Sequence, residues 1–226
     1  MTDGAVLVVA RAPVAGQAKT RLAAHVGSVA AADLAAAALL DVLAAVTSAG
    51  ARLVVALTGD LGQAARRDAV AAALAQADVF AQRGDAFADR LAAAHAEARA
   101  LVGTGPAILQ VGMDTPQLTP ALLRASLRTA DASDAALGLA EDGGWWALAV
   151  RDPAWADALR AVPMSRADTG ERTLAALRAA GAQVAVLPTV RDVDTWADAR
   201  AVAALTPDSA FGAAVEALAE QSSHQP

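Results

Sequence analysis

Short apolar runs alternate along this chain with longer stretches of helical period. Seven runs are candidate strands: Ala5–Ala10, Arg52–Leu57, Asp78–Ala81, Ala107–Val111, Ala135–Leu139, Trp145–Val150 and Val184–Leu187. The clearest helices lie between them: Ala30–Ala49, Gln63–Ala75, Phe87–Val102, Pro120–Thr129 and Thr173–Ala180. Because βα units place their helices on the faces of a parallel sheet, this order predicts an α/β fold with a mostly parallel sheet.

Several helix ends carry local signals. Gly181 stands just past a predicted helix, where glycine commonly ends the last turn. Thr119 followed by Pro120 is typical of an N-cap and a first helical residue. Thr195 with Asp198 three positions later resembles a capping box, which predicts that another helix begins there.

The 226 residues are interpreted as one domain. Neither an internal repeat nor a Gly/Ser-rich linker interrupts the chain, and a single α/β core can fill this length. We expect residues 1–221 to fold together and residues 222–226 to form a disordered tail. The alanine-rich helix faces and the segment 208–221 are compatible with a homodimer.

Composition narrows the class of protein. Hydrophobic residues make up 56% of the chain, but many are alanines, and no unbroken apolar run approaches the roughly 20 residues of a spanning helix. The first run, Ala5–Ala10, is too short and lacks the flanking signals of a secretion signal, so we expect a cytoplasmic protein without a membrane partner. The chain has no cysteine, which excludes disulfides, and its three histidines are far apart in the sequence, which disfavours a zinc site. The net charge of −6 disfavours a nucleic-acid partner.

Two acidic loops each follow an apolar run. Asp114 lies in GMDTPQLTP, and Asp192 and Asp194 lie in RDVDTWADA. Carboxylates at converging strand ends are well placed to hold a divalent cation, so we expect Mg²⁺ or Mn²⁺ at Asp114 and at Asp192 or Asp194, with Asp192 favoured. The alternatives are that Asp114 caps its own turn and that the later acids complement a helix dipole, which is the interpretation chosen for Asp198.

The first loop, Arg11 to Leu22, is basic. Arg11, Lys19 and Arg21 surround Gly16 directly after the first strand, at the edge of an open sheet where ligands bind. We interpret the loop as a phosphate-binding segment, with a solvated basic turn as the alternative. It lacks the glycines of a Walker A loop and of a dinucleotide-binding fingerprint.

Two later loops carry weaker signals. In AEDGGWWALAV, the Asp142 side chain and the Gly143–Gly144 backbone are candidates for substrate binding, although a plain tight turn also explains them. The two neighbouring tryptophans point to opposite sheet faces, so one belongs to the core. The loop VPMSRADTGERT, with Ser165 and Arg166, is a candidate acceptor loop or an ordinary surface segment.

Six segments, in order, resemble a known family. They are RAPVAGQAKTRL, QRGDAFADRLAAAHAEA, QVGMDTPQLTP, AEDGGWWALAV, VPMSRADTGERTLAAL and DVDTWADA. Together they resemble bacterial glycosyltransferase-like proteins of the GT-A (nucleotide-diphospho-sugar transferase) fold, which are related to 2-phospholactate guanylyltransferases. The resemblance implies a single-domain GT-A fold in which Lys19 and Arg21 meet nucleotide phosphates, Asp114 binds the metal and the Asp192 region closes the site. The family usually has Pro-Glu where Trp196 and Ala197 stand.

The resemblance and the charged loops together imply a nucleotide-using transferase. Its substrates would be a nucleoside triphosphate or a nucleotide-sugar and a small acceptor, and its catalytic residues would be Lys19, Asp114 and Asp142. We favour nucleotidyl transfer with pyrophosphate release, because a cation cluster suits a triphosphate and an anionic acceptor needs no general base. Glycosyl transfer, with Asp142 or Glu141 as base, is the alternative. A nucleotide sensor without turnover is a further alternative.

Overall fold

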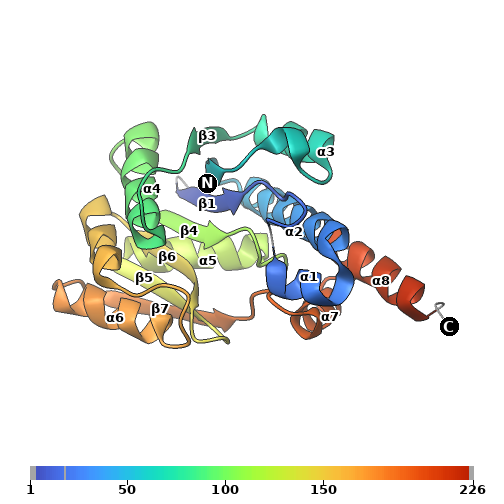
Figure 1. Cartoon of the computed structure of the whole chain (residues 1–226). Coiled ribbons are helices and arrows are strands. Elements are labelled where there is room, and N and C mark those ends of the chain that lie inside the picture. Colours follow the sequence, from blue (N-terminus) through green and yellow to red (C-terminus); the bar gives the residue numbers. More distant parts are fainter. Residues whose placement is uncertain (1–3, 18, 224–226) are drawn as a thin grey trace.

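The computed structural model describes residues 4–17 and 19–223, and its centre is one seven-stranded sheet (Figure 1). The strand order is β3-β2-β1-β4-β6-β5-β7. All seven predicted strands are present, with ends shifted by at most three residues: β1 Ala5–Arg11, β2 Arg52–Thr58, β3 Asp78–Ala81, β4 Ile108–Gly112, β5 Ala135–Ala140, β6 Trp145–Val150 and β7 Val184–Val190. Only β6 runs antiparallel to its neighbours, so the prediction of a mostly parallel sheet is confirmed.

Ten helical segments surround the sheet within the described chain. They are α1 Thr20–Val26, α2 Ser28–Ala49, η1 Leu61–Gln63, α3 Arg67–Leu74, α4 Phe87–Val102, α5 Pro120–Asp131, η2 Pro153–Ala161, α6 Thr169–Ala179, α7 Trp196–Ala203 and α8 Ala210–Ser223. The helix expected at Thr195 is α7, whose capping box is present. Helix α8 runs two residues into the tail expected to be disordered, and residues 224–226 lie outside the description.

Two predicted helix starts were wrong. The helix expected from Gln63 begins at Arg67, because the Asp60 side chain caps Gly62 N–H and makes a separate 3₁₀ turn first. The helix expected from Thr173 begins four residues earlier, at Thr169, whose hydroxyl donates to the Pro163 carbonyl. Helices α1, η1, η2 and α8 were not predicted.

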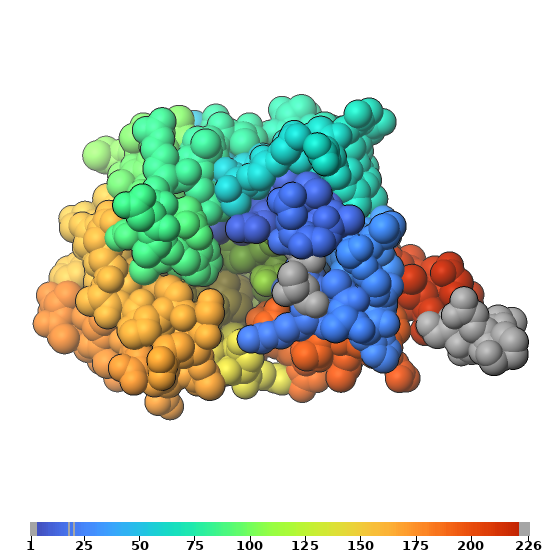
Figure 2. Space-filling view, in the orientation of Figure 1, coloured from blue at the N-terminus to red at the C-terminus, as the bar shows by residue number. Residues whose placement is uncertain are grey.

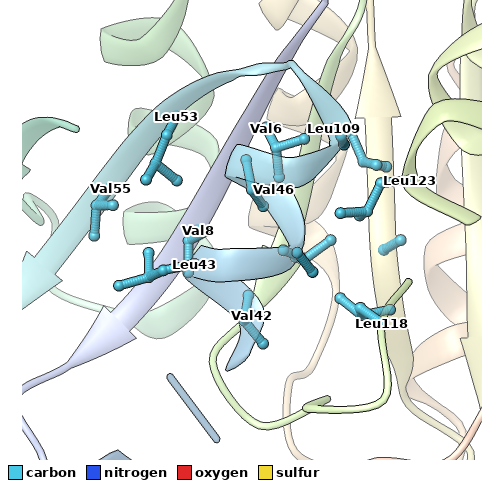
Figure 3. Packing of buried hydrophobic residues seen from close by; sticks show 14 of the residues in the cluster. Val6, Val8, Val42, Leu43, Val46, Leu53, Val55, Leu109, Leu118 and Leu123 are labelled. Carbon is cyan, nitrogen blue, oxygen red and sulfur yellow. The ribbon is translucent and has the colours of Figure 1, made fainter. Parts of the chain in front are cut away.

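Helices cover both faces of the sheet. On one face, Val6 and Val8 of β1 pack with α2, α3 and α5 in a cluster that Figure 3 shows from close by. On the other face, Leu7 of β1 packs against α4, while β5 and β6 pack against η2 and α6. Strands buried on both faces explain the unbroken apolar runs in the sequence. Helices α1, α7 and α8 add an outer layer against α2.

Helix α2 accounts for much of the hydropathy. It is long and apolar enough to cross a membrane by length and composition, although Asp33 and Asp41 interrupt its apolar run. In the fold it is a core helix, because 67% of its most apolar window is buried. It packs on the sheet on one side and on α8 on the other, and both contacts require apolar residues.

The topology brings the predicted site loops to one edge. Strands β1, β2, β3 and β4 are parallel, and β5 and β7 share their direction because antiparallel β6 lies between β4 and β5. The loops that leave the carboxyl ends of these strands therefore meet at the same edge. In open α/β sheets this edge is where ligands bind.

Candidate functional site

Three carboxylates from two distant loops meet at this edge. Asp114 follows β4, whereas Asp192 and Asp194 follow β7, and one oxygen of each lies within 4.8 Å of the others. The loops are joined by a hydrogen bond from the Val193 N–H to the Asp114 carbonyl at 3.0 Å, and the Gln117 amide also donates to the Arg191 carbonyl. The expected convergence of the acidic loops is therefore present, with both later acids in the group.

Alternation of side chains separates the two later acids from the core. Val193, which lies between Asp192 and Asp194, is only 2% exposed and packs among residues of α1, α2, α7 and α8. A carboxylate oxygen of each flanking residue belongs to the acidic group, so both neighbours of the buried Val193 lie towards Asp114. The apolar anchor thus aims the two carboxylates.

Lys19 lies between two of the acids. Its Nζ donates to Asp114 Oδ2 at 2.8 Å and to Asp194 Oδ1 at 3.0 Å, and its side chain is only 13% exposed. Burial alone lowers the pKa of the Lys19 ammonium, but the opposing charges of Asp114 and Asp194 outweigh it and raise the pKa overall. Arg21 adds a more exposed contact to Asp194 Oδ2 at 3.2 Å. These contacts place the basic loop directly beside the acidic group.

The backbone fixes Lys19 at the start of α1. Lys19 has a left-handed conformation (φ 49°) and precedes the first helical residue, while Leu22 one turn later is buried in the outer helical layer. His25, in the last turn of α1, stacks on Trp196 of α7 with ring centroids 5.7 Å apart. Trp196, which stands where the resembling family usually has proline, thus ties α1 to the helix that follows Asp194.

Asp192 lies among other carboxylates. Burial, followed by the nearby charges of Asp142, Asp114 and Asp194, raises the pKa of its carboxyl to about 6. Unlike Asp114 and Asp194, Asp192 has no cationic partner among the described residues. An uncompensated carboxylate among like charges is a favourable position for a divalent cation, and three carboxylates supply the hard oxygen ligands that Mg²⁺ and Mn²⁺ prefer.

The acidic group opens into a cleft of about 630 Å³. Figure 2 shows it as a hollow between the blue N-terminal segment, green α4 and the orange segment around η2 and α6. A smaller hollow of about 350 Å³, lined by Gln17, Lys19 and Arg21, lies next to it and shares Asp114. Most of the site residues predicted from the sequence line one hollow or the other: Arg11, Lys19, Arg21, Asp114, Asp142, Gly144, Asp192 and Asp194.

Gly16 and Gly143 are not among the residues that line these two hollows. Gly16 is exposed, and its φ of 79° indicates a turn that glycine favours. Gly143 has a φ of 89°, and an added Cβ would lie 1.8 Å from the Ala167 carbonyl oxygen. Its carbonyl accepts a hydrogen bond from the Gly170 N–H at 2.8 Å. Gly143 therefore packs the β5–β6 turn against the loop before α6 and does not face the cleft.

The β5–β6 turn divides its acids between two roles. Asp142 accepts a hydrogen bond from the Gly144 N–H at 2.7 Å and lines the cleft. Glu141 instead pairs with Arg191 at 2.6 Å and lies outside the cleft, which removes support for Glu141 as a base. Of the two tryptophans, Trp146 is 3% exposed, as expected for one core tryptophan, and both Trp145 and Trp146 line the cleft.

The cleft also contains residues that the sequence did not single out. Gln82, Arg90 and Met164 line it, as do Thr58 and Gln110, a residue that is 98% buried with an unpartnered Oε1. The weakly indicated Ser165 and Arg166 line it as well, and Asp168 pairs with Arg172 at 2.6 Å. The sequence signal for Gln82 and Arg90 was that QRGDAFADRL is among the six segments that resemble a known family, since nothing in its local pattern marks a site.

Comparison with known protein families shows to which family the chain belongs. The family described as "uncharacterized protein conserved in bacteria" (DUF2064) matches residues 39–166. The chain belongs to this DUF2064 family. No curated protein matches it.

Solved structures share the fold of this DUF2064 protein. A provisionally named nucleotide-diphospho-sugar transferase from Desulfovibrio desulfuricans G20 is 26% identical, with a TM-score of 0.81 and 98% of each chain covered. Rv0371c of Mycobacterium tuberculosis H37Rv, solved as a complex with manganese, is 23% identical (TM-score 0.53; 88% of this chain and 96% of that chain). A nucleotidyl transferase from Methanothermobacter is 20% identical (TM-score 0.51; 86% and 93%). The fold is therefore that of nucleotide-diphospho-sugar transferases and nucleotidyltransferases, as the sequence motifs implied.

Proposed function

We propose that this DUF2064 protein is a metal-dependent nucleotidyltransferase that acts on a nucleoside triphosphate and a small anionic acceptor. The meeting of Asp114, Asp192 and Asp194 beside Lys19 carries the proposal. This arrangement combines a candidate cation site with a fixed ammonium at the ligand-binding edge of the sheet. The shared fold with nucleotidyltransferases supports the same class of chemistry.

The acidic group would hold Mg²⁺ or Mn²⁺. Its carboxylates fit such an ion in ligand type and spacing, and a structure of similar fold was solved with manganese. Such an ion would supply positive charge that offsets the negative charge of the phosphates and of the leaving pyrophosphate. Lys19, which contacts Asp114 and Asp194, lies close enough to the acidic group to contact a phosphate bound beside it.

The cationic side chains would bind the triphosphate. Lys19, Arg11 and Arg21 line the smaller hollow beside Asp114, so a phosphate chain in that position meets three positive groups. Each well-placed group of this kind typically lowers the barrier by roughly 3–4 kcal/mol, because it stabilises charge that develops during the reaction.

The acceptor would lie at the other side of the cleft. Gly144, Trp145, Ser165 and Arg166 line that side and come from the β5–β6 turn and the loop before α6. An acceptor oxygen that is already anionic attacks the α-phosphorus, a new P–O bond forms, and the bond to the bridging oxygen breaks, which releases pyrophosphate. The Arg166 guanidinium would bind the anionic acceptor, and the reaction needs no general base.

Glycosyl transfer is a second candidate. It is favoured by the similarity to the provisionally named nucleotide-diphospho-sugar transferase, which extends over 98% of both chains. In that reaction the acceptor hydroxyl loses a proton as it attacks the sugar carbon, and Asp142 would be the base because it lines the cleft. The nucleoside diphosphate leaves with the pair of electrons of the broken C–O bond.

Product release distinguishes the two reactions. Pyrophosphate is measured with a panel of nucleoside triphosphates and small phosphorylated or carboxylated acceptors, and nucleoside diphosphate is measured with a panel of nucleotide-sugars. Asp114→Asn should lower turnover by roughly 100-fold or more, because it removes charge where the cation binds. Asp208→Asn, at an exposed position outside the cleft, is the matched control and should retain activity. Full turnover in Asp114→Asn would refute the metal assignment.

A further inference from the structure

The side chain of Gln82 is fixed in one orientation at the edge of the cleft. Gln82 follows β3, and its Nε2 donates two hydrogen bonds, to the Ala10 carbonyl at 2.8 Å and to the Ala56 carbonyl at 3.0 Å. Its backbone N–H also donates to the Leu57 carbonyl at 3.0 Å. Ala10 and Ala56 belong to β1 and β2, so the Gln82 amide joins the carboxyl ends of two neighbouring strands.

These bonds decide which polar atom Gln82 presents to a ligand. A primary amide has two N–H donors, and both are used. Turning the amide over would place Oε1 against two carbonyl oxygens, and three acceptors without a proton repel one another. Oε1 has no hydrogen-bond partner within the described part of the chain, and the side chain lines the cleft. Gln82 therefore offers the cleft a hydrogen-bond acceptor that cannot become a donor.

The distance between Gln82 Oε1 and the acidic group suits a bound nucleoside. The Gln82 amide contacts β1 and β2, whereas Asp114 follows β4, on the other side of β1. Neighbouring strands are about 4.8 Å apart, so the two groups are separated by about two strand spacings, on the order of 10 Å. This is the scale of a nucleoside between its base edge and its 5′ phosphate. The cleft wall between them includes Val9 and Thr58.

We infer that Gln82 determines which nucleobase binds, by accepting a hydrogen bond from an N–H group on the edge of the base. The inference rests on the proposed nucleotide-using function. It assigns the choice of nucleobase to a residue that is not among those proposed to bind the metal or the phosphates. A base that presents a lone pair at this point is repelled by Oε1. A base that presents an N–H is accepted, and an analogue without that N–H leaves the acceptor unpaired, which is the basis of strong discrimination.

A double-mutant cycle between Gln82 and one base N–H tests this inference. Calorimetry with Mg²⁺ first measures the dissociation constants of ATP, CTP, GTP and UTP. The triphosphate that binds best is then compared with analogues in which hydrogen or a methyl group replaces one N–H group of the base at a time. We expect one analogue to bind the wild-type protein roughly 3- to 10-fold more weakly, which corresponds to one net hydrogen bond. In Gln82→Met, the same two nucleotides should bind equally well.

Two further variants separate recognition from folding. Gln82→Lys keeps a donor for the Ala10 and Ala56 carbonyls but offers no acceptor, so it should also lose the discrimination while remaining folded. Gln76→Met, at an exposed glutamine, is the matched control and should discriminate as the wild type does. Binding of inorganic tripolyphosphate should be unchanged in all three variants, because the phosphate-binding groups are intact.

The outcomes distinguish this inference from the proposed function. If the wild type binds triphosphates but every analogue binds as well as its parent, or if both Gln82 variants still discriminate, the inference about Gln82 is wrong and the proposed nucleotide site stands. If the wild type binds neither triphosphates nor nucleotide-sugars, the proposed function is wrong and the inference falls with it. Loss of discrimination in both Gln82 variants alone supports the inference.

Discussion

His95 should make the folded protein sensitive to acid. This residue lies in α4, is fully buried, and has no hydrogen-bond partner for either ring nitrogen among the residues described. Burial, with a smaller effect from the positive charge of Arg99, lowers the pKa of His95 from 6.5 to about 3. The unfolded chain therefore binds a proton at a pH where the folded protein does not, and protonation favours unfolding.

The size of the effect follows from the two pKa values. Each pKa unit corresponds to about 1.4 kcal/mol, and at pH 5 the unfolded histidine is largely protonated whereas the folded one is neutral. Stability from this group is complete above pH 6.5 and is lost as the pH falls towards 3. Between pH 7 and pH 5 the loss amounts to about 2 kcal/mol. The raised pKa of Asp192 acts in the opposite direction, since protonating this half-buried carboxyl on acidification stabilises the folded state.

The variant His95→Leu isolates the histidine from Asp192 and the other acids. Urea unfolding is measured at pH 7 and at pH 5 for both proteins, without divalent cations. The decrease in free energy of unfolding should be about 2 kcal/mol larger for the wild type than for the variant, because all other titrating groups are shared. The variant should also be at least as stable at pH 7, because two unpaired polar atoms are removed. Equal decreases in the two proteins would show that His95 is not neutral and buried in solution.

Other substitutions and additions give further predictions. Adding Mn²⁺ at 100 times its dissociation constant should raise the free energy of unfolding by about 2.7 kcal/mol and a chelator should reverse this; a melting temperature that ignores Mn²⁺ would contradict the acidic site. Lys19→Met should destabilise the metal-free protein by roughly 1–3 kcal/mol, because Asp114 and Asp194 lose their shared donor, and should tighten Mn²⁺ binding in calorimetry; weaker Mn²⁺ binding would show that the ammonium assists the ion. Gly143→Ala should cost more than about 1 kcal/mol in urea unfolding, with Gly16→Ala as a comparison without a steric contact; equal costs would mean that Ala167 moves aside.

The sheet could be predicted because its strands have a simple sequence pattern. Central strands that are covered on both faces are continuous apolar runs, and the longest helices between them show a clear period. Helix starts depended on contacts that no local pattern contains. Thr169 and Gly170 begin α6 because Thr169 bonds to Pro163 and Gly170 packs against the Gly143 and Gly144 carbonyls. These partners are brought together only by the complete fold.

Some features of the candidate site could likewise be predicted from the sequence, and others could not. The meeting of Asp114 with Asp192 and Asp194 could be anticipated, because loops after parallel strands share one edge of the sheet. The direct contact of Lys19 with two acids depends on α1, whose seven residues gave no clear helical signal. Only the segment QRGDAFADRL indicated the region of Gln82, because the contacts that fix its amide come from carbonyl groups of two other strands. The packing of Gly143 against Ala167 could not be predicted, because a positive φ serves turn packing as well as ligand approach.

The buried position of Val193 connects the loop that carries Asp192 and Asp194 to a distant helix. Phe211, 1% exposed in α8, belongs to the same apolar cluster as Val193. Any molecule, neighbouring subunit or substitution that shifts the C-terminal helix would also tilt the segment carrying both flanking acids. Substitutions in α8 would therefore alter the acidic group without changing any residue that lines the cleft.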